Sequence, residues 1–414
     1  MVWTGVNEPL LIVGLGALLI GALLPWLTAG MSTDRWLRGA LMLAGALACS
    51  VALQSLARSI WSPHRETAAS AVVEGAFRPV ATATLTSAAC VDALSRRMGE
   101  LTAASRLASI ADADGALPAD PIGLVSGSAT GTYHAVADDL VAVARRQGVP
   151  LFNRETLGSL DNLRKLADPA ENAALGFAQS DILAVLARAN DPADRKAAML
   201  LRLVLPLYAE EVHVLARAGV RTLADLAGRH VVIAASSQGS LHTADNLLRA
   251  AGITPASLNS QQTAASALCS VLTGRADAMV IVAGKPTTHL VSLDALLTHP
   301  ARPLDQVHLL PLALPVQNVG YEVASIKPDD YVWVKEPVDT LAVRALLMAF
   351  DFSPQRTDYQ RRRCRQLQRL GSLMQRELPV LARPPHHVKW REVDPKRPVS
   401  GWRFDTCSRV HLGH

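Results

Sequence analysis

From residue 121 to about residue 377, short apolar runs alternate with longer stretches in which apolar residues recur every three or four positions. The short runs predict strands buried on both faces, and the longer stretches predict helices. This alternation is typical of an open α/β sheet. We expect strands at 121–126, 174–178, 211–216, 230–235, 278–283 and 307–310, and helices at 88–111, 133–147, 158–167, 180–188, 241–251, 263–273 and 355–377.

The first sixty residues have a different composition from the rest of the chain. Pro9–Thr33 and Gly39–Ala57 contain no charged residue, and each could cross a membrane of about 30 Å as a helix. The segment between them carries Arg35 and Arg38, whereas the chain before Pro9 has no Lys or Arg. Positive charge favours the cytoplasmic side, so the residues after 60 are expected outside.

A second interpretation of this region leads to the same side of the membrane. Met31 could be the true start, because a basic segment and an apolar run follow it, as in a signal peptide. Residues 1–60 are therefore either a membrane hairpin or a misassigned start followed by a signal peptide. In both cases we expect the protein on the periplasmic side of the inner membrane, secreted there or attached through an uncleaved N-terminus.

Charge and cysteine content exclude some classes of protein. The net charge is +5, and the densest basic run, "QRRRCRQLQRL" at 360–370, has no interleaved aromatic residue, so nucleic-acid binding is not expected. No cysteine pair or histidine has zinc-site spacing, so no metal is expected. An oxidising compartment would permit a Cys364–Cys407 disulfide; two unpaired thiols are the alternative.

Small-polar loops recur where an expected strand meets an expected helix, at 126–134, 178–182, 235–244 and 282–290. Ligands of open α/β sheets bind at the carboxyl ends of strands, so these loops can converge on one cleft. The first loop lacks the lysine of a phosphate loop and the glycine frame of a dinucleotide site. No nucleophile and base stand in a catalytic frame. We therefore expect a binding protein, neither an enzyme nor a holder of a cofactor.

Six stretches of the sequence carry a family resemblance, and they occur in a fixed order. They are "GSATGTYHAVADDLVAVAR" from residue 127, "LGFAQSDIL" from 175, "LYAEEVHVLARAGVRTLADLAGRHVVIAASSQGS" from 207, "GRADAMVIVAGKPTTHL" from 274, "VGYEVASIKPDDYVW" from 319 and "KWREVDPKRPVSGWRF" from 389. They resemble the TAXI-type solute-binding subunits of TRAP transporters, which are periplasmic two-lobed binding proteins. The resemblance covers about residues 121–407. It departs from the family at Ser126, Ser128, Gln238, His242 and Lys285.

The resemblance implies a set of ligand contacts, and for each the alternative is an ordinary capping hydroxyl or turn glycine. Lys285 stands where a small residue is common, and we expect it to supply a counter-charge to a carboxylate. The expected ligand-binding residues are Ser128, Thr130, Gly131, Thr132, Tyr133, Gln179, Ser180, Ser236, Gln238, Gly239, Ser240, Gly284 and Lys285.

The resemblance also implies the architecture and the function. The fold class is α/β, a two-lobed periplasmic-binding-protein fold of type II-like form, preceded by one or two hydrophobic helices. The protein would capture a small carboxylate or amino acid and deliver it to TRAP permease subunits. The alternative is a membrane-tethered periplasmic ligand sensor with the same fold. The expected parts are 1–60 as above, 61–120 as linker and helical extension, 121–212 as lobe 1, 213–314 as lobe 2, and 315–414 as the return to lobe 1 with a C-terminal helix and tail.

The two forms of the N-terminus predict different mature proteins. A released subunit should begin near residue 58, because its signal peptide is removed, whereas a tethered sensor should keep Pro9–Thr33. Mass spectrometry of the mature N-terminus measures this directly. Retention of Pro9–Thr33 would contradict release and support the tether.

Overall fold

The computed structural model describes residues 84–110, 121–234, 238–313 and 321–412. The chain divides into two compact units, Met1–Pro79 and Val80–His414, and every described residue belongs to the second. The apolar runs at Pro9–Thr33 and Gly39–Ala57 lie outside the described residues. Within the described ranges, no helix is both long enough and apolar enough to cross a membrane.

The described strands form one ten-stranded sheet. Its main path runs β2-β1-β3-β10-β4-β7-β5-β6, with β8 paired to β4 and β9 paired to β10. The strands are β1 (Ile122–Val125), β2 (Leu151–Arg154), β3 (Ala173–Gln179), β4 (Leu201–Arg217), β5 (His230–Ala234), β6 (Ser257–Gln262), β7 (Ala278–Ala283), β8 (Val307–Leu309), β9 (Glu322–Ile326) and β10 (Val338–Phe350).

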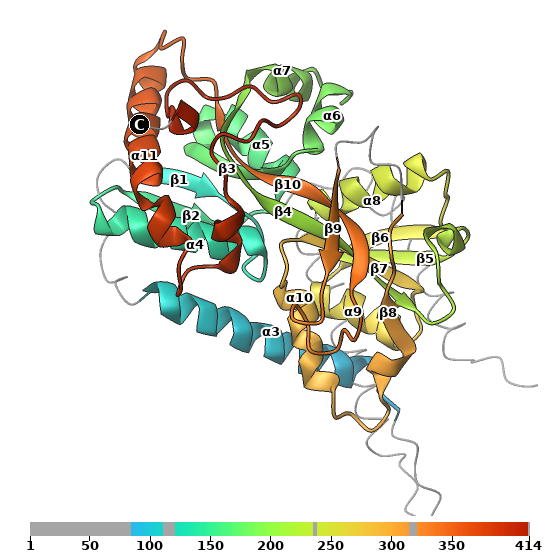
Figure 1. Ribbon diagram of the computed structural model, residues 1–414. Coiled ribbons are helices and arrows are strands. Elements are labelled where there is room, and N and C mark those ends of the chain that lie inside the picture. The colour runs from blue at the N-terminus through green and yellow to red at the C-terminus, as the bar shows by residue number, and fades with distance from the viewer. Residues whose placement is uncertain (1–83, 111–120, 235–237, 314–320, 413–414) are drawn as a thin grey trace, which may run out of the picture. The chain divides into compact units, whose positions relative to one another are not determined.

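Two similar halves lie on either side of the long strands β4 and β10. In one half β1 pairs in parallel with β2 and β3, and in the other β5 pairs in parallel with β6 and β7. Strand β10 joins β3, strand β4 joins β7, and β4 and β10 pair antiparallel to each other, as Figure 1 shows. This is the α/β, two-lobed binding-protein fold, so the fold class expected from the sequence is confirmed. We call the half with β1–β3 lobe 1 and the half with β5–β7 lobe 2.

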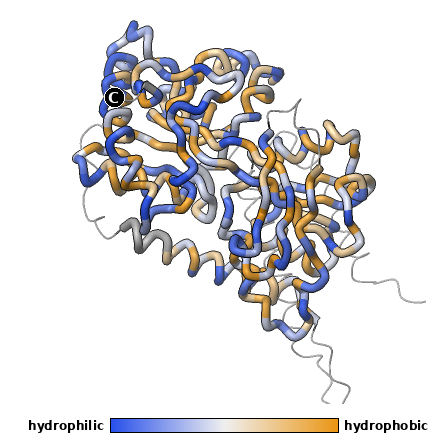
Figure 2. Tube along the Cα trace, in the orientation of Figure 1, coloured by the Kyte–Doolittle hydropathy of each residue, from blue (hydrophilic) through white to orange (hydrophobic). Residues whose placement is uncertain are grey.

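Apolar helix faces cover both halves of the sheet. Lobe 1 carries α4 (Thr132–Arg146), α5 (Ser159–Ala167), α6 (Ile182–Ala187) and α7 (Pro192–Leu200), and lobe 2 carries α8 (Gln238–Ala250), α9 (Ala264–Leu272) and α10 (Thr288–Val291). The chain then returns to lobe 1, where buried leucines of α11 (Asp358–Leu381) pack in one core with α4. In Figure 2 the central strands are mostly orange, whereas the outward-facing, arginine-rich α11 is largely blue.

The sequence of β4 explains how it can cross the middle of the sheet. All but three of its seventeen residues are buried, in agreement with its nearly continuous apolar composition. Pro206 has no N–H to donate, and the register of β4 against β10 shifts between Arg344 and Leu346, next to Pro206. Proline within a sheet is tolerated at such irregularities.

The sequence missed some strands for physical reasons. Strand β10, "VDTLAVRALLMAF", is mostly apolar and has no strict alternation of apolar and polar residues, so periodicity alone does not distinguish it from a buried helix. Strand β6, "SLNSQQ", lies at the sheet edge and is largely polar. The expected lobe boundary between residues 212 and 213 falls inside β4, and the boundaries stay a prediction.

Two disulfides hold helices in place. Cys364 of α11 is bonded to Cys407 of the C-terminal tail, the pair that the sequence suggested. Cys90 of α3 (Ser87–Ile110) is bonded to Cys269 of α9, a pairing that the sequence analysis did not anticipate. Arg97 adds an ion pair with Asp294 at 2.6 Å. Helix α3 is therefore fixed covalently and electrostatically to lobe 2.

Removing either disulfide should lower the free energy of unfolding. The Cys90–Cys269 bond spans 179 residues and the Cys364–Cys407 bond spans 43, so the chain-entropy relation gives about 5 and about 4 kcal/mol. Urea unfolding of the two double Cys→Ala variants, followed by circular dichroism beside the wild type, measures the losses. A loss below about 1 kcal/mol in either variant would contradict the expectation.

Candidate functional site

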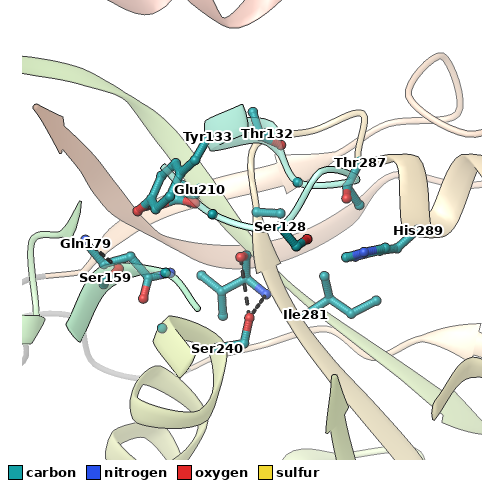
Figure 3. Close-up of a pocket in the computed structure, with 16 residues that line it drawn as sticks. Ser128, Thr132, Tyr133, Ser159, Gln179, Glu210, Ser240, Ile281, Thr287 and His289 are labelled. Atoms are coloured by element: carbon teal, nitrogen blue, oxygen red, sulfur yellow. Dashed lines mark hydrogen bonds between the residues drawn. The ribbon is translucent and has the colours of Figure 1, made fainter. Parts of the chain in front are cut away.

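A cavity of about 60 Å³ lies between the two lobes, and we call it the interlobe cavity. It has room for roughly four to six water-sized groups, which suits a small solute. Figure 3 shows Tyr133, Glu210, Gln179 and Ser159 toward one end and His289 with Thr287 toward the other. Seven expected ligand residues line it: Ser128, Gly131, Thr132, Tyr133, Gln179, Gly239 and Ser240.

The N-terminus of α4 lies at this cavity, which Gly131, Thr132 and Tyr133 line. Gly131 is the N-cap and has no side chain with which to accept from the first turn. The first N–H groups of a helix have no partner within it, and the helix dipole makes this end favourable for an anion. The Thr132 hydroxyl donates to the carbonyl oxygen of Gly284 at 3.1 Å, so this side chain links the two lobes.

A buried carboxyl group, that of Glu210 on β4, also lines the cavity. The Tyr133 hydroxyl donates to Glu210 Oε2 at 2.6 Å, and the Tyr133 ring stacks on Phe177 with 5.1 Å between ring centroids. Glu210 is only 3% exposed. Burial raises the pKa of Glu210 to about 8, although the hydrogen bond from Tyr133 acts in the opposite direction. At neutral pH this carboxyl group is therefore mostly protonated.

Three lining side chains carry buried polar atoms without a protein partner among the described residues. These atoms are Gln179 Oε1, Thr287 Oγ1 and His289 Nδ1. The side chains are 2%, 1% and 4% exposed, respectively. Burial lowers the pKa of His289 to about 4, so its ring is neutral at pH 7. Buried polar atoms are nearly always hydrogen-bonded, so these three are available to a polar solute.

Two glycines stand where backbone and side chains approach closely. A Cβ at position 239 would lie 2.2 Å from Gln179 Oε1, well inside contact distance. A Cβ at position 284 would meet Lys389 Cε, Thr132 Cγ2 and Tyr208 Cε2, each at 3.1 Å. Gly239 therefore lets the start of α8 in lobe 2 lie against Gln179 of lobe 1.

Several expected ligand residues lie beside the interlobe cavity without lining it. The Thr130 hydroxyl lies 3.3 Å from His289 Nε2 and so connects the lobes. Ser180 instead lines a second, separate cavity together with Asp181 and Tyr321, and its hydroxyl accepts from the backbone N–H of Arg344 at 3.1 Å. Gly284 offers its carbonyl oxygen to Thr132. Ser236 lies outside the described residues, and the side chain of Gln238 is likewise not described.

Lys285 does not supply a counter-charge to this cavity. Its Nζ donates to Asp330 Oδ2 at 2.8 Å and to the carbonyl oxygen of Ser325 at 2.5 Å. Its charge is therefore already neutralised, and the side chain does not line the interlobe cavity. The sequence did not reveal this partner, because Asp330 follows Lys285 by 45 residues, and a ligand role for Lys285 stays a prediction.

A buried ion-pair cluster supports the loop that follows β7. Lys389, on the short helix η6 (Val388–Glu392), donates to Glu211 Oε1 and Glu392 Oε1, both at 2.7 Å. Glu211 Oε2 accepts from the backbone N–H of Lys285 at 2.9 Å. Burial raises the pKa of Glu211, and Lys389 opposes that shift. The C-terminal segment thus fixes a loop of lobe 2 next to the cavity.

Sequence reasoning missed four polar residues that line the cavity: Ser159, Glu210, Thr287 and His289. One signal was available for Glu210, because it interrupts an otherwise apolar strand, "LYAEEVHVLA". Ser159, Thr287 and His289 are placed by turns whose geometry the sequence does not specify. No group of three His, Cys, Asp or Glu residues within the described ranges is placed to hold a metal ion.

The topology and the interlobe cavity define this protein as a member of the two-lobed binding-protein class. Residues 124–361 match the model of the NMT1-like family, and the chain belongs to that family. Membership of the TAXI type, which the sequence resembles, stays a prediction. No curated protein matches the chain.

Several solved structures are similar over most of their length. One, titled the structure of a periplasmic transporter, is 14% identical, with a TM-score of 0.42, over 72% of this chain and 93% of that chain. MatC from Rhodopseudomonas palustris with bound malate is 16% identical, with a TM-score of 0.40, over 68% and 92%. A periplasmic sulfonate-binding protein from Methylobacillus flagellatus is 12% identical, with a TM-score of 0.38, over 68% and 75%. None of these scores reaches 0.5, so the likenesses carry no conclusion about ligand or partner.

Replacing Glu210 by Gln should remove a pH dependence of stability. In the wild type the pKa of Glu210 is about 8 in the folded state against an ordinary value of 4.5. Between these values the folded state holds a proton that the unfolded state has released, so stability falls as pH rises through this window. The slope from this group is up to about 1.4 kcal/mol per pH unit. Urea unfolding between about pH 5 and pH 8 compares both proteins, and equal slopes would contradict the assignment.

Proposed function

We propose that this protein is an extracytoplasmic solute-binding protein that captures a small polar solute between its lobes and delivers it to a TRAP-type secondary transporter. The observation that carries the proposal is the interlobe cavity, in which buried polar atoms from both lobes have no hydrogen-bond partner among the described residues. A solute that bonds to both lobes stabilises the arrangement in which the lobes are in contact. In this role the protein binds the solute and releases it unchanged.

The two disulfides support an extracytoplasmic location. Cys90–Cys269 and Cys364–Cys407 are both formed between buried cysteines. Disulfides persist in oxidising compartments such as the bacterial periplasm, and they are rare in the cytosol. This agrees with the orientation expected from Arg35 and Arg38 and with the signal-like segment after Met31.

The connection between the lobes supports binding by lobe closure. Strands β4 and β10 extend from one lobe into the other, and hydrogen bonds across the cavity join Thr132 to Gly284 and Thr130 to His289. A further bond joins Thr243 of α8 to Asp181 at 2.8 Å. Hinge motion about a few connecting strands is a common way for two-lobed proteins to enclose a ligand.

The groups in the cavity favour binding over catalysis. Its ionisable side chains among the described residues are Tyr133, Glu210 and His289. His289 is a poor base at pH 7, because burial lowers its pKa to about 4. Its contact with the Thr130 hydroxyl at 3.3 Å is long for activation of a nucleophile.

A thermal-shift screen of the purified protein against small amino acids and organic acids tests the proposal. A true ligand at a hundred times its dissociation constant should stabilise the folded state by about 2.7 kcal/mol. Gly239→Ala should weaken binding of that ligand at least about tenfold, because the added Cβ collides with Gln179.

Gly219→Ala is the matched control, since a Cβ at Gly219 meets no atom within 4 Å. This variant should bind like the wild type. Equal binding by wild type and Gly239→Ala would show that the solute binds elsewhere. If none of the solutes shifts the melting temperature, the binding function itself loses its support.

A further inference from the structure

The interlobe cavity has an unusual balance of charge for a site expected to hold a carboxylate. No lysine or arginine is among its described lining residues, and its only acidic side chain is Glu210. Two lysines near the cavity are already paired. Lys285 is paired with Asp330, and Lys389 is paired with both Glu211 and Glu392. A solute carrying only negative charge would find no free cation here, and it would lie near a carboxyl group.

Resting on the proposed function, we infer that Glu210 is the subsite for a positively charged nitrogen of the solute, which displaces the proton of the Glu210 carboxyl group. Capture of the solute would thus require an ammonium group on the solute and would release the proton of Glu210. The proton passes to solvent or buffer, and no covalent bond of the solute changes.

The geometry around Glu210 offers acceptors to such a nitrogen. Glu210 Oε2 accepts from Tyr133, whereas Oε1 accepts no hydrogen bond from the residues that the structure describes. Gln179 Oε1 lines the same cavity, is buried and lacks a partner in those residues. An ammonium group has three donors and no acceptor, so it matches a carboxylate oxygen and an amide oxygen together. Figure 3 shows Glu210 and Gln179 at the same end of the cavity.

The cavity also has a place for a negative group on the same solute. The N-terminus of α4 begins at Gly131 and has no capping side chain, which leaves backbone donors on the cavity wall. Donors at that end and acceptors at Glu210 and Gln179 match a small zwitterion better than a simple carboxylate. The volume of about 60 Å³ limits the solute to a small one.

The groups around Glu210 determine whether its carboxyl group keeps or releases its proton. Tyr133 of α4 donates to it, and the charged or titratable neighbours on other elements are Asp181 after β3, Tyr208 and Glu211 on β4, and Lys389 and Glu392 on η6. Asp181 and Glu211 disfavour a charge on Glu210, and Lys389 is shared between two carboxylates. Burial therefore keeps the proton on Glu210 until a cation arrives.

Matched solutes that differ only in the charged nitrogen test the inference. The pairs are glycine with glycolate, L-alanine with L-lactate, and L-glutamate with L-2-hydroxyglutarate, measured by isothermal calorimetry on the full protein. We expect the amino member of the fitting pair to bind about ten- to a hundredfold more tightly than its hydroxy partner. Its binding should release about one proton at pH 7, seen by comparing two buffers of different ionisation enthalpy, and should tighten about tenfold from pH 6 to pH 7.

The variants assign this behaviour to one side chain. Glu210→Gln should lose the preference for the amino member and the proton release, while Asp181→Asn and Glu211→Gln should keep both. A melting temperature for each variant shows that it is folded.

The outcomes separate the inference from the proposed function. If a hydroxy acid binds as well as its amino partner, or if Glu210→Gln retains the preference, the inference is overturned while solute binding stands. Binding that is weaker at pH 7 than at pH 6 would also overturn the inference, because Glu210 would then act as a proton donor to an anion. If no member of any pair binds, both the inference and small-solute capture fail.

Discussion

The antiparallel pairing of β4 with β10 is the constraint on which the rest of the structure depends. The outer edge of β10 carries β3 of lobe 1, and the outer edge of β4 carries β7 of lobe 2. Buried backbone groups must keep their hydrogen bonds, so this pair twists or bends more readily than it separates. The lobes therefore move relative to each other mainly by deformation of β4 and β10. Each time the lobes close, the same loops at the strand ends come together around the interlobe cavity.

Buried charge beneath the cavity adds a second constraint. Lys389 is 1% exposed and is held between Glu211 and Glu392, and Glu211 also accepts from the backbone of Lys285. Removing one partner of a buried ion pair leaves an uncompensated charge, which typically costs about 3–5 kcal/mol. The C-terminal segment is consequently a structural part of the site, although Lys389 lies 178 residues after Glu211.

Much of this organisation could be predicted from local sequence, and the rest depends on contacts distant in the chain. Loops at strand-to-helix junctions identified Thr132, Tyr133, Gln179 and Ser240, because parallel strands bring their carboxyl ends together. Strand β10 was missed because its mostly apolar sequence does not alternate with a strand's period of two. The pairing of Lys285 with Asp330 could not be predicted, because tertiary packing brings these two residues together. Glu210 carried a readable signal, an acidic residue inside a buried strand.

The attachment of α3 has a mechanical consequence. Its first turn is bonded through Cys90 to α9, and Arg97 is paired with Asp294, so this half of the helix belongs to lobe 2, while α3 also contacts α4 of lobe 1. A pull on the chain ahead of α3 is transmitted through the disulfide directly to lobe 2. When the lobes move apart, the contact between α3 and α4 must change, while the covalent attachment of α3 to lobe 2 stays fixed.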